Sequence, residues 1–348
     1  MSAALDLGSS EFRSLRREDQ RLIARRMPAI YTVLDDLPEH RRLLEQTRTA
    51  YSLAAGSIVV IGEAAYETSR LLSRPVVPLL HGGELGADDP IGRQVCAQMI
   101  SLLLPASHTS GNLCAITLPA GATSTDSSNH WTCQFLQHVV QLQGYDSMVM
   151  NSATALSLAE LEDDEFTGGC LTIGAESITF SLTFQSRPVV EARLKKGVRP
   201  VLEQFAHARK KYLWDGAGNS YLDLSKLQRW LQSGDLSLVS PQSEDELWLR
   251  SAFEETLLSA WFALKRKIAS CHETLLSRPL PIVISGAVTQ LTGFTDVVRE
   301  SIELSGIPLE VQGIRVASFD PYSVARGLLI QAALTSGGPV RRQEVDAA

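Results

Sequence analysis

The stretch ALDLGSSEF (4–12) holds residue types that can bind phosphate. A short apolar run ends at Asp6, Gly8 permits a tight turn, and Ser9 and Ser10 supply hydroxyl groups. Backbone N–H groups in such a turn point into a concavity that can hold an anion, although ordinary hairpins show the same pattern. The stretch therefore predicts a strand and a turn, and leaves open both phosphate binding and a hairpin without a ligand.

The other reactive residue types form no common catalytic signature. The five cysteines include no C-x-x-C pair and the seven histidines show no metal-ligand spacing, so we predict neither a metal site nor a redox pair. The sequence has no G-x-x-x-x-G-K-[ST] phosphate loop, no G-x-G-x-x-G after a strand and no G-x-S-x-G turn. These motifs favour none of the common enzyme classes, and we predict no catalytic residue.

Composition indicates a globular protein without a nucleic-acid surface. The chain has 348 residues, of which 44% are hydrophobic, and its net charge of −7 argues against nucleic-acid binding. The arginines between Arg13 and Arg26 are offset by nearby acids, so we interpret them as a solvated face. No apolar stretch reaches the ~20 residues of a membrane-spanning helix, and Asp6 interrupts any signal peptide, which together predict a cytoplasmic location.

Alternating strand and helix patterns predict a mixed α/β protein. We expect strands at 57–62, 112–121, 147–151, 168–174, 177–184 and 280–286, and helices at 90–104, 126–143, 197–213 and 244–272. In the last helix, the Trp and Phe residues, including Trp261 and Phe262, are expected in the core. The acidic, glycine-containing stretch 159–169 predicts a boundary between domains at 1–158 and 159–336, with small subdomains at about 31–75 and 190–245 and a disordered tail at 337–348.

Six stretches, in order along the chain, resemble the actin/Hsp70/sugar-kinase superfamily, and most closely the MreB-like bacterial actins. They are 4–12, 113–123, 144–159, 168–182, 281–311 and 320–334. The resemblance implies an α/β, actin-like (ribonuclease H-like) fold, in which two similar α/β domains flank a central cleft. It also implies that ATP and Mg²⁺ bind in this cleft. The matching binding positions here are Asp6, Gly8, Ser9, Ser10, Gly174, Ala175, Gly286 and Ala287.

Several positions of that nucleotide site hold different residues in this chain. Thr172 stands where the family has an acid, and Glu176 replaces a glycine of the same turn. Asn151 and Ser152 stand where the family has its water-positioning acid. A carboxylate about 4 Å from a phosphate costs on the order of 4 kcal/mol per charge pair at an effective dielectric near 20. We therefore expect that ATP hydrolysis has been lost, although pairing of Glu176 with an arginine would leave the phosphate site usable.

The resemblance implies a cytoskeletal or scaffold protein with a role in cell shape. Its expected partners are further copies of itself, arranged head to tail, and cell-shape or envelope proteins. The polar stretch 105–112 argues against direct membrane binding, so the membrane would be reached through partners. Three alternatives remain open: an ATP-binding, filament-forming switch with slow hydrolysis, a small-molecule kinase or phosphatase, and an adaptor resembling FtsA or PilM that a partner protein recruits.

Overall fold

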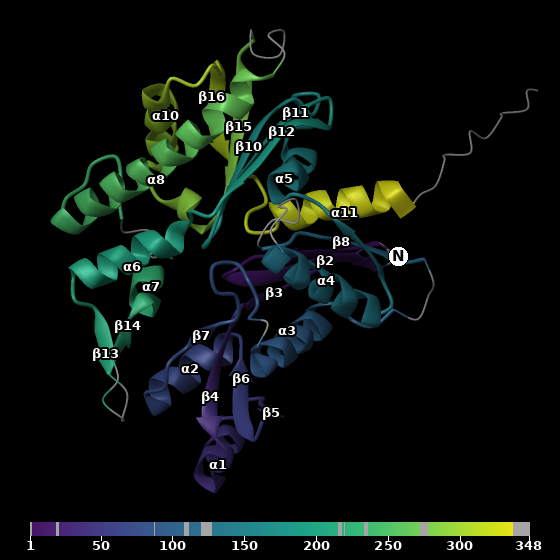
Figure 1. Cartoon of the computed structure of the whole chain (residues 1–348), viewed down its shortest axis with the longest axis vertical. Helices are drawn as coiled ribbons and strands as arrows, with labels where there is room; N and C mark the ends of the chain where they lie inside the picture. The colour runs from purple at the N-terminus through teal and green to yellow at the C-terminus, as the bar shows by residue number, and fades with distance from the viewer. Residues whose placement is uncertain are drawn as a thin grey trace, which may run out of the picture.

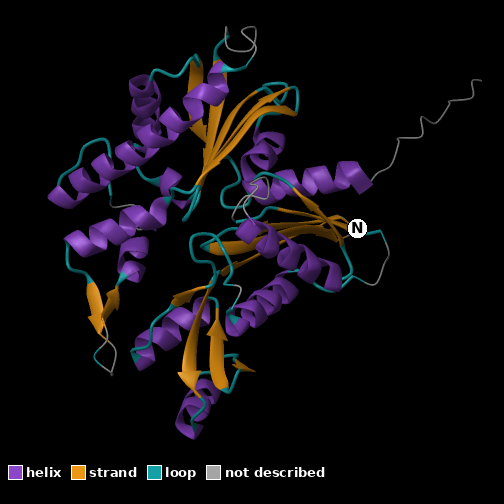
Figure 2. Cartoon of the chain, viewed as in Figure 1, coloured by secondary structure: helices purple, strands orange, loops and turns teal. Residues whose placement is uncertain are grey.

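Two five-stranded sheets form the body of the protein, and two smaller sheets extend from it (Figure 1, Figure 2). This computed structural model describes residues 2–18, 21–86, 88–107, 111–119, 127–214, 218, 220–232, 236–271 and 278–336. The disordered tail expected at 337–348 lies outside the described residues.

The first large sheet has the strand order β3-β2-β1-β8-β9. Its strands are β1 (Ser2–Leu7), β2 (Glu11–Glu18), β3 (Arg21–Pro28), β8 (Leu113–Ile116) and β9 (Asp146–Val149). Strands β1, β2 and β3 are antiparallel, whereas β8 and β9 run parallel to β1. Because β1 is the central strand, the residues from Ala3 to Leu7 are buried, which explains the short apolar run at the start of the chain.

The second large sheet repeats this topology with the order β12-β11-β10-β15-β16. Its strands are β10 (Gly168–Ile173), β11 (Ile178–Phe184), β12 (Arg187–Leu194), β15 (Leu280–Ser285) and β16 (Val311–Val316). Again the first three strands along the chain are antiparallel, and the last two run parallel to the central strand. The chain therefore contains two similarly built halves, each with its first hairpin at the centre of its sheet.

Helices cover both sheets, and two of them lie between the sheets. The outer helices are α3 (Pro90–Leu103) and α4 (Ser127–Leu142) on the first sheet, and α8 (Glu244–Ala269) and α10 (Phe294–Ser305) on the second. Helix α5 (Ser152–Glu160) follows the first sheet in the chain but packs on β10 and β11 of the second. Helix α11 (Ser323–Ser336) follows the second sheet but packs on β1 and β8 of the first. The two helices also pack on each other, and their contact joins the two halves (Figure 1).

Each large sheet is extended by a smaller unit. The first consists of β4 (Ile30–Asp35), β5 (Ser52–Ala54), β6 (Ser57–Ile61), β7 (Val77–Pro78), α1 (Pro38–Gln46) and α2 (Glu63–Leu72). The second consists of α6 (Val198–Ala208), β13 (Tyr212–Trp214), β14 (Ser220–Leu222) and α7 (Leu224–Gln232). A short 3-10 helix, η1 (Ala287–Gln290), follows β15.

Most of the expected elements are present, and the differences have physical causes. Helix α8 begins with a capping box, in which Ser243 and Glu246 bond each other's backbone N–H groups. The long helix expected at 197–213 ends at Ala208, because the chain turns into β13. Trp261 is fully buried as expected, but Phe262 is 54% exposed, so its predicted core position is wrong. Successive residues of a helix point in different directions, and only Trp261 faces the sheet.

The interpretation of the arginine cluster as a solvated face is wrong for two of its members. Strand β2 lies inside the sheet, between β1 and β3, so that Arg16 is buried and Arg13 is half-buried. Arg16 forms an ion pair with Glu18, with 2.7 Å between Nη2 and Oε1. Both guanidinium groups are therefore part of the folded interior.

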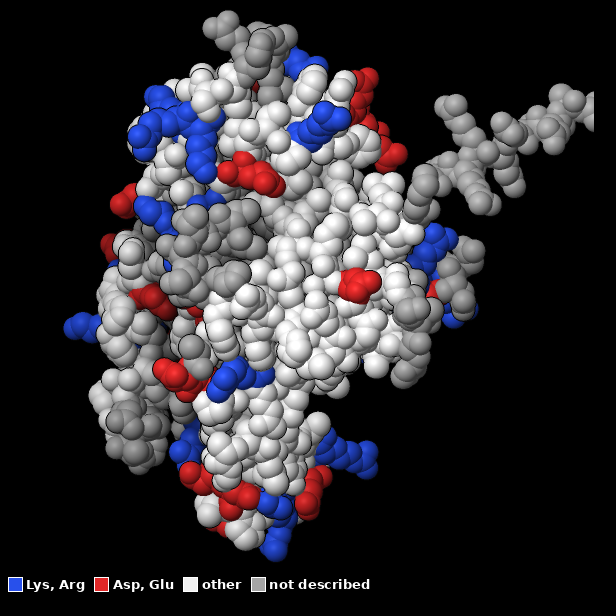
Figure 3. Space-filling view, turned by 45° about the vertical axis from the view of Figure 1, so that its right-hand side comes forward, with Lys and Arg blue, Asp and Glu red and all other residues white. Residues whose placement is uncertain are grey.

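The surface shows charges of both signs rather than a continuous basic area on the face in view. In Figure 3 the Lys, Arg, Asp and Glu side chains gather toward the upper and lower ends, around a broad middle with few charges. Among the described helices, none combines the length and the apolar character needed to cross a lipid bilayer.

Candidate functional site

The two central hairpins turn in the same way. Leu7 pairs with Phe12 across the first turn, and Ile173 pairs with Ile178 across the second. Each turn begins with a glycine that is packed against the end of its own turn. A Cβ on Gly8 would lie 2.9 Å from the carbonyl oxygen of Glu11, and one on Gly174 would lie 3.1 Å from that of Ser177. The fold itself thus favours glycine at both positions, whether or not an anion binds.

Asp6, at the first turn, is held by two side chains. Thr117 donates a hydrogen bond of 2.6 Å to Oδ1, and Arg13 forms an ion pair of 3.2 Å with Oδ2. Arg13 also pairs with Glu11 at 2.7 Å. Burial opposes the charge on Arg13, but the carboxylates of Asp6 and Glu11 outweigh it and raise the pKa of the guanidinium group. Asp6 is therefore already paired with a cation that belongs to the protein.

The two serines of the first turn have different surroundings. Ser9 is buried, and Gly83, in the loop before α3, lies against it. A Cβ on Gly83 would lie 3.2 Å from the carbonyl oxygen of Pro119 and 3.5 Å from the Ser9 hydroxyl, and the φ of +81° also favours glycine there. Ser10 is exposed. The first turn therefore has one buried hydroxyl group, on Ser9, and one exposed hydroxyl group, on Ser10.

Glu176, in the second turn, is paired with an arginine. Its carboxylate contacts the guanidinium group of Arg199 in the first turn of α6, and both side chains are largely buried. Burial raises the pKa of Glu176 above its ordinary value of 4.5, and Arg199 opposes this effect. Gly197 makes the close approach of α6 possible, because a Cβ there would lie 2.3 Å from the carbonyl oxygen of Ala175. The negative charge of Glu176 is therefore compensated within the protein.

The positions of the two missing acids lie next to each other. The hydroxyl groups of Ser152 and Thr172 are hydrogen-bonded at 2.9 Å. Asn151 caps α5, since its side-chain oxygen accepts a bond of 2.9 Å from the N–H of Ala153. A neutral hydroxyl pair and a helix cap thus occupy the place where the resemblance implies acids, and neither group is a general base at neutral pH.

The third turn, at Gly286 and Ala287, packs directly on the second. Gly286 has a φ of +140°, and a Cβ there would lie 2.1 Å from the carbonyl oxygen of Ile173. Asp320 accepts hydrogen bonds from the Ser285 hydroxyl at 2.6 Å and from the Gly286 N–H at 3.3 Å. Burial raises the pKa of Asp320 above 3.8, against these bonds and the charge of Arg13. Asp320, which lies between β16 and α11, therefore holds the third turn through both a side chain and the backbone.

Arg193, on β12, connects the second turn to the first half of the chain. Its Nη1 donates 2.8 Å to the carbonyl oxygen of Leu118, and its Nη2 donates 2.8 Å to the Ser177 hydroxyl. Leu118 is adjacent to Thr117, which bonds Asp6, so one chain of contacts runs from Asp6 to the second turn. Burial lowers the pKa of Arg193 to about 10, so the side chain is still charged at neutral pH.

Two further contacts join the halves away from these turns. Lys195 pairs with Glu84 at 3.2 Å, and the Tyr66 hydroxyl of α2 donates 3.1 Å to the side chain of Gln228 on α7. The second contact links the two small units to each other. The halves are thus held together at their turns and at their small units by side chains of the protein itself.

The residues present do not fit a divalent cation held by the protein. Among the described residues, no group of three His, Cys, Asp or Glu side chains could hold a metal ion. Asp6 is already bonded to Arg13 and Thr117, and Thr172 is uncharged. The same residues are compatible with an anion, because the glycines and serines of the first turn remain and Arg199 compensates Glu176.

All eight binding positions taken from the resemblance lie in or directly beside the three turns. They are Asp6, Gly8, Ser9, Ser10, Gly174, Ala175, Gly286 and Ala287. The sequence reasoning missed four residues at these turns. Arg13 and Thr117 bond Asp6, Asp320 bonds the third turn, and Arg193 connects the second turn to the first half. Asp320 could have been noticed, because it begins the stretch DPYSVARG within a motif that supports the resemblance.

Comparisons with known proteins agree with this architecture. A family model described as Volactin matches residues 1–332. A MamK double helical filament has a TM-score of 0.69 at 13% identity, with 95% of this chain and 99% of that chain covered. MreB5 of Spiroplasma citri bound to ADP gives 0.64 at 13% identity, with 96% and 97% covered.

A third solved structure is also similar to this chain. The ethanolamine utilization protein EutJ from Carboxydothermus hydrogenoformans has a TM-score of 0.53 at 12% identity, with 94% of this chain and 88% of that chain covered. The sequence comparison with curated proteins gives no significant match. The structural similarities confirm the predicted α/β, actin-like fold and the resemblance to MreB-like proteins.

Proposed function

The chain belongs to the Volactin family, and on this basis and its actin-like fold we propose that it is a cytoskeletal or scaffold protein that assembles into filaments without hydrolysing ATP. The observation that supports the last part is the hydrogen bond between Ser152 and Thr172. Hydrolysis needs a group that positions and deprotonates water, and a cation that neutralises developing charge. Two neutral hydroxyl groups supply neither.

Self-association is supported by the structural relatives. The MamK structure is a double helical filament, and it covers almost the whole of this chain. The proposed partners are therefore further copies of the chain, and beyond them cell-shape or envelope proteins, with a cytoplasmic location and any contact with the membrane made through those partners. The proposed domains follow the two large sheets, at 1–158 and 159–336.

Sedimentation with and without nucleotide tests this function. We expect the purified full chain to pellet equally with ATP, with ADP and without nucleotide, and to release phosphate no faster than a heat-denatured sample. Pelleting that requires ATP, together with phosphate release, would contradict the loss of hydrolysis. If the chain does not pellet at all, the filament proposal fails, and an adaptor recruited by a partner protein becomes the better explanation.

A second candidate, an ATP-binding switch with slow hydrolysis, is favoured by the pairing of Glu176 with Arg199. This pairing removes the repulsion that an unpaired carboxylate would exert on phosphate. If ATP binds at the first turn, Ser9→Asp should weaken its binding at least about tenfold in a calorimetric titration. The new carboxylate, close to that of Asp6, would repel the phosphates of ATP. The exposed Ser101 provides the matched control, and Ser101→Asp should leave the affinity unchanged.

Absence of ATP binding at millimolar concentration would exclude the switch. It would leave the filament proposal intact, since that proposal requires no nucleotide. A kinase or phosphatase activity has no support from Thr172 and Asn151, because both side chains are uncharged and both are already hydrogen-bonded within the protein.

A further inference from the structure

Strand β3 forms a long and regular edge of the first large sheet. Each of its residues pairs with β2 in one continuous register, and no described strand pairs with its other side. None of these residues is buried, and most are exposed. The outward backbone N–H and C=O groups of an edge strand have no partner within the sheet, so β3 is a template on which one more strand can pair.

The corresponding strand of the second half, β12, is a less suitable template. It contains Pro188, which has no N–H group to donate, and its register with β11 shifts between Leu182 and Thr183. Edge strands are commonly protected from further pairing by such prolines and irregularities. Strand β3 has a proline only at its last residue, Pro28, and its register has no shift, so its backbone edge is open to pairing.

Two arginines give the edge of β3 a positive charge that the described acids do not compensate. Arg21 and Arg25 are exposed and lie on the same face, because residues four apart in a strand point to the same side. The Nη1 of Arg25 donates 2.9 Å to the carbonyl oxygen of Leu102 on α3, which is a neutral acceptor. Glu18 lies opposite Arg21 in the register, but its carboxylate is paired with Arg16. A further carboxylate beside these two arginines would therefore be attracted to them.

The other face of the same edge is partly apolar. Leu22 is 64% exposed, and Ala24 on the same side is exposed as well. Arg26 follows them on this face, but it lies 3.8 Å from Glu11, so its charge has a partner within the protein. An added strand would meet two cations on one face and Leu22 and Ala24 on the other. This pattern matches an extended segment in which acidic and apolar residues alternate.

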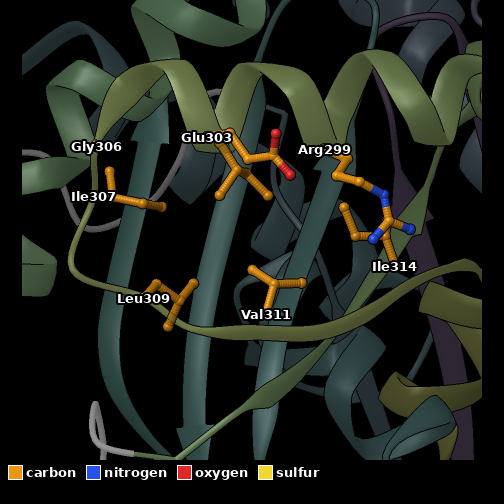
Figure 4. A pocket seen from close by; sticks show the side chains of 8 residues that line it. Arg299, Glu303, Gly306, Ile307, Leu309, Val311 and Ile314 are labelled. Atoms are coloured by element: carbon orange, nitrogen blue, oxygen red, sulfur yellow. The ribbon is translucent and has the colours of Figure 1, made fainter.

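The pocket between α10 and β16 gives no comparable indication of a ligand. Its volume is about 190 Å³, whereas a small-molecule site usually has about 300–1,000 Å³. Figure 4 shows one cation and one anion on α10, Arg299 and Glu303, opposite Ile307, Leu309 and Val311. Small size and mixed charge identify no class of ligand, whereas β3 combines an open backbone edge with one sign of charge.

We propose that β3 is a docking site for an extended, acidic segment of a partner protein, which adds a strand to the first large sheet. Its acidic residues lie beside Arg21 and Arg25, and its apolar residues lie beside Leu22 and Ala24. Main-chain hydrogen bonds supply affinity, and the alternating side chains supply specificity. A second copy of the chain is a poor occupant, because two paired β3 edges bring their arginines together. The inference goes beyond the proposed filament and does not require it.

Calorimetric titration with a synthetic peptide tests the charge and the location of this site. The probe has alternating glutamate and valine residues and the same length as β3, eight residues. We expect it to bind the full chain, and a lysine–valine peptide of equal length not to bind. Arg21→Glu combined with Arg25→Glu should weaken binding at least about tenfold.

The matched control makes the same change of charge elsewhere. Arg42 on α1 and Arg70 on α2 are also exposed, and Arg42→Glu combined with Arg70→Glu should leave the affinity for the peptide unchanged. The proposal is overturned by an equal effect of the two double variants, by equal binding of the lysine–valine peptide, or by no binding at about 1 mM peptide. None of these results changes the expected sedimentation of the wild type, so the filament proposal is tested separately.

A modified peptide tests the pairing of the backbone without any change to the protein. N-methylation of two glutamates and two valines removes N–H donors from both edges of the peptide but keeps every charge. We expect this peptide to bind at least about tenfold more weakly than the unmodified one, since strand addition depends on main-chain hydrogen bonds. Equal binding would show that charge attraction alone holds the peptide, and would overturn strand addition.

A membrane surface and a second copy are the other occupants that the experiment distinguishes. Vesicles containing phosphatidylserine should bind the chain more weakly than the glutamate–valine peptide does. Tighter binding to these vesicles, lost with Arg21→Glu and Arg25→Glu, would overturn the choice of a protein partner. Self-association of the wild type that the peptide reverses, measured by light scattering, would show that β3 pairs with a second copy, and would overturn it as well.

Discussion

We expect Gly327→Ala to lower the free energy of unfolding by about 3 kcal/mol or more. Gly327 lies in α11, where the helix crosses α5, and a Cβ there would lie 1.7 Å from the carbonyl oxygen of Ala155. Helix propensity alone predicts the opposite sign, since alanine favours an exposed helix by about 1 kcal/mol over glycine. The clash is with backbone, so α11 must move away from α5. Urea denaturation of the two proteins measures the difference.

Gly313→Ala is the matched control for this change. Gly313 lies in β16, and a Cβ there would meet no atom within 4 Å. Its replacement should change the free energy of unfolding by no more than about 0.5 kcal/mol. If Gly327→Ala were as mild as the control, the close crossing of α5 and α11 would not be needed for stability.

Glu160→Ala should lower the free energy of unfolding by about 3 kcal/mol. Glu160 is buried at the end of α5, and its carboxylate accepts bonds from Arg315 at 2.8 Å, from the Ser318 N–H at 3.0 Å and from the Ser323 hydroxyl at 2.9 Å. Replacement by alanine removes the carboxylate, and the three donors then have no acceptor at this position. Glu162→Ala, two residues farther along at an exposed position, should have little effect in the same denaturation experiment.

The contribution of Glu160 should depend on pH in one direction. Burial alone would raise its pKa, but the bonds from Ser318, Arg315 and Ser323 outweigh burial and hold the pKa below 4.5. Its stabilisation is therefore complete above about pH 4.5 and is lost as the pH falls through the lower pKa of the folded state. The difference in stability between the wild type and Glu160→Gln should shrink below pH 4.5. A difference that stays constant down to pH 3 would contradict this role.

The sequence predicts best the strands that are buried along nearly their whole length. Strands β10, β11 and β15 are buried along nearly their whole length; β15 is an almost continuous apolar run, whereas β11 alternates apolar residues with Thr and Ser. Strand β3 was not predicted, because it lies at the edge of its sheet, where the surface accepts the arginines of RLIARRMP. The arginines of β2 itself concealed that this strand lies inside the sheet, because its buried cations Arg13 and Arg16 are paired with acids rather than replaced by apolar residues.

For the candidate site, sequence reasoning found the turns and missed their connections. Glycines such as Gly174 and Gly286 can be recognised because the backbone conformation and close packing of a turn restrict the residue type. The pairing of Glu176 with Arg199 or of Asp6 with Arg13 depends on which strands and helices become neighbours, and one sequence does not specify this. The loss of both acids was visible, but only the structure brings Ser152 and Thr172 into contact.

The exchange of α5 and α11 between the two sheets has a consequence for the order of folding during synthesis. The face of the first sheet formed by β1 and β8 is covered by α11, which belongs to the last part of the described chain. When the ribosome has completed residues 1–160, the buried residues Ala4, Leu15 and Ala115 still lack this cover. The first half therefore emerges as an incomplete unit with an exposed apolar face, and it becomes fully folded only after α11 has been translated.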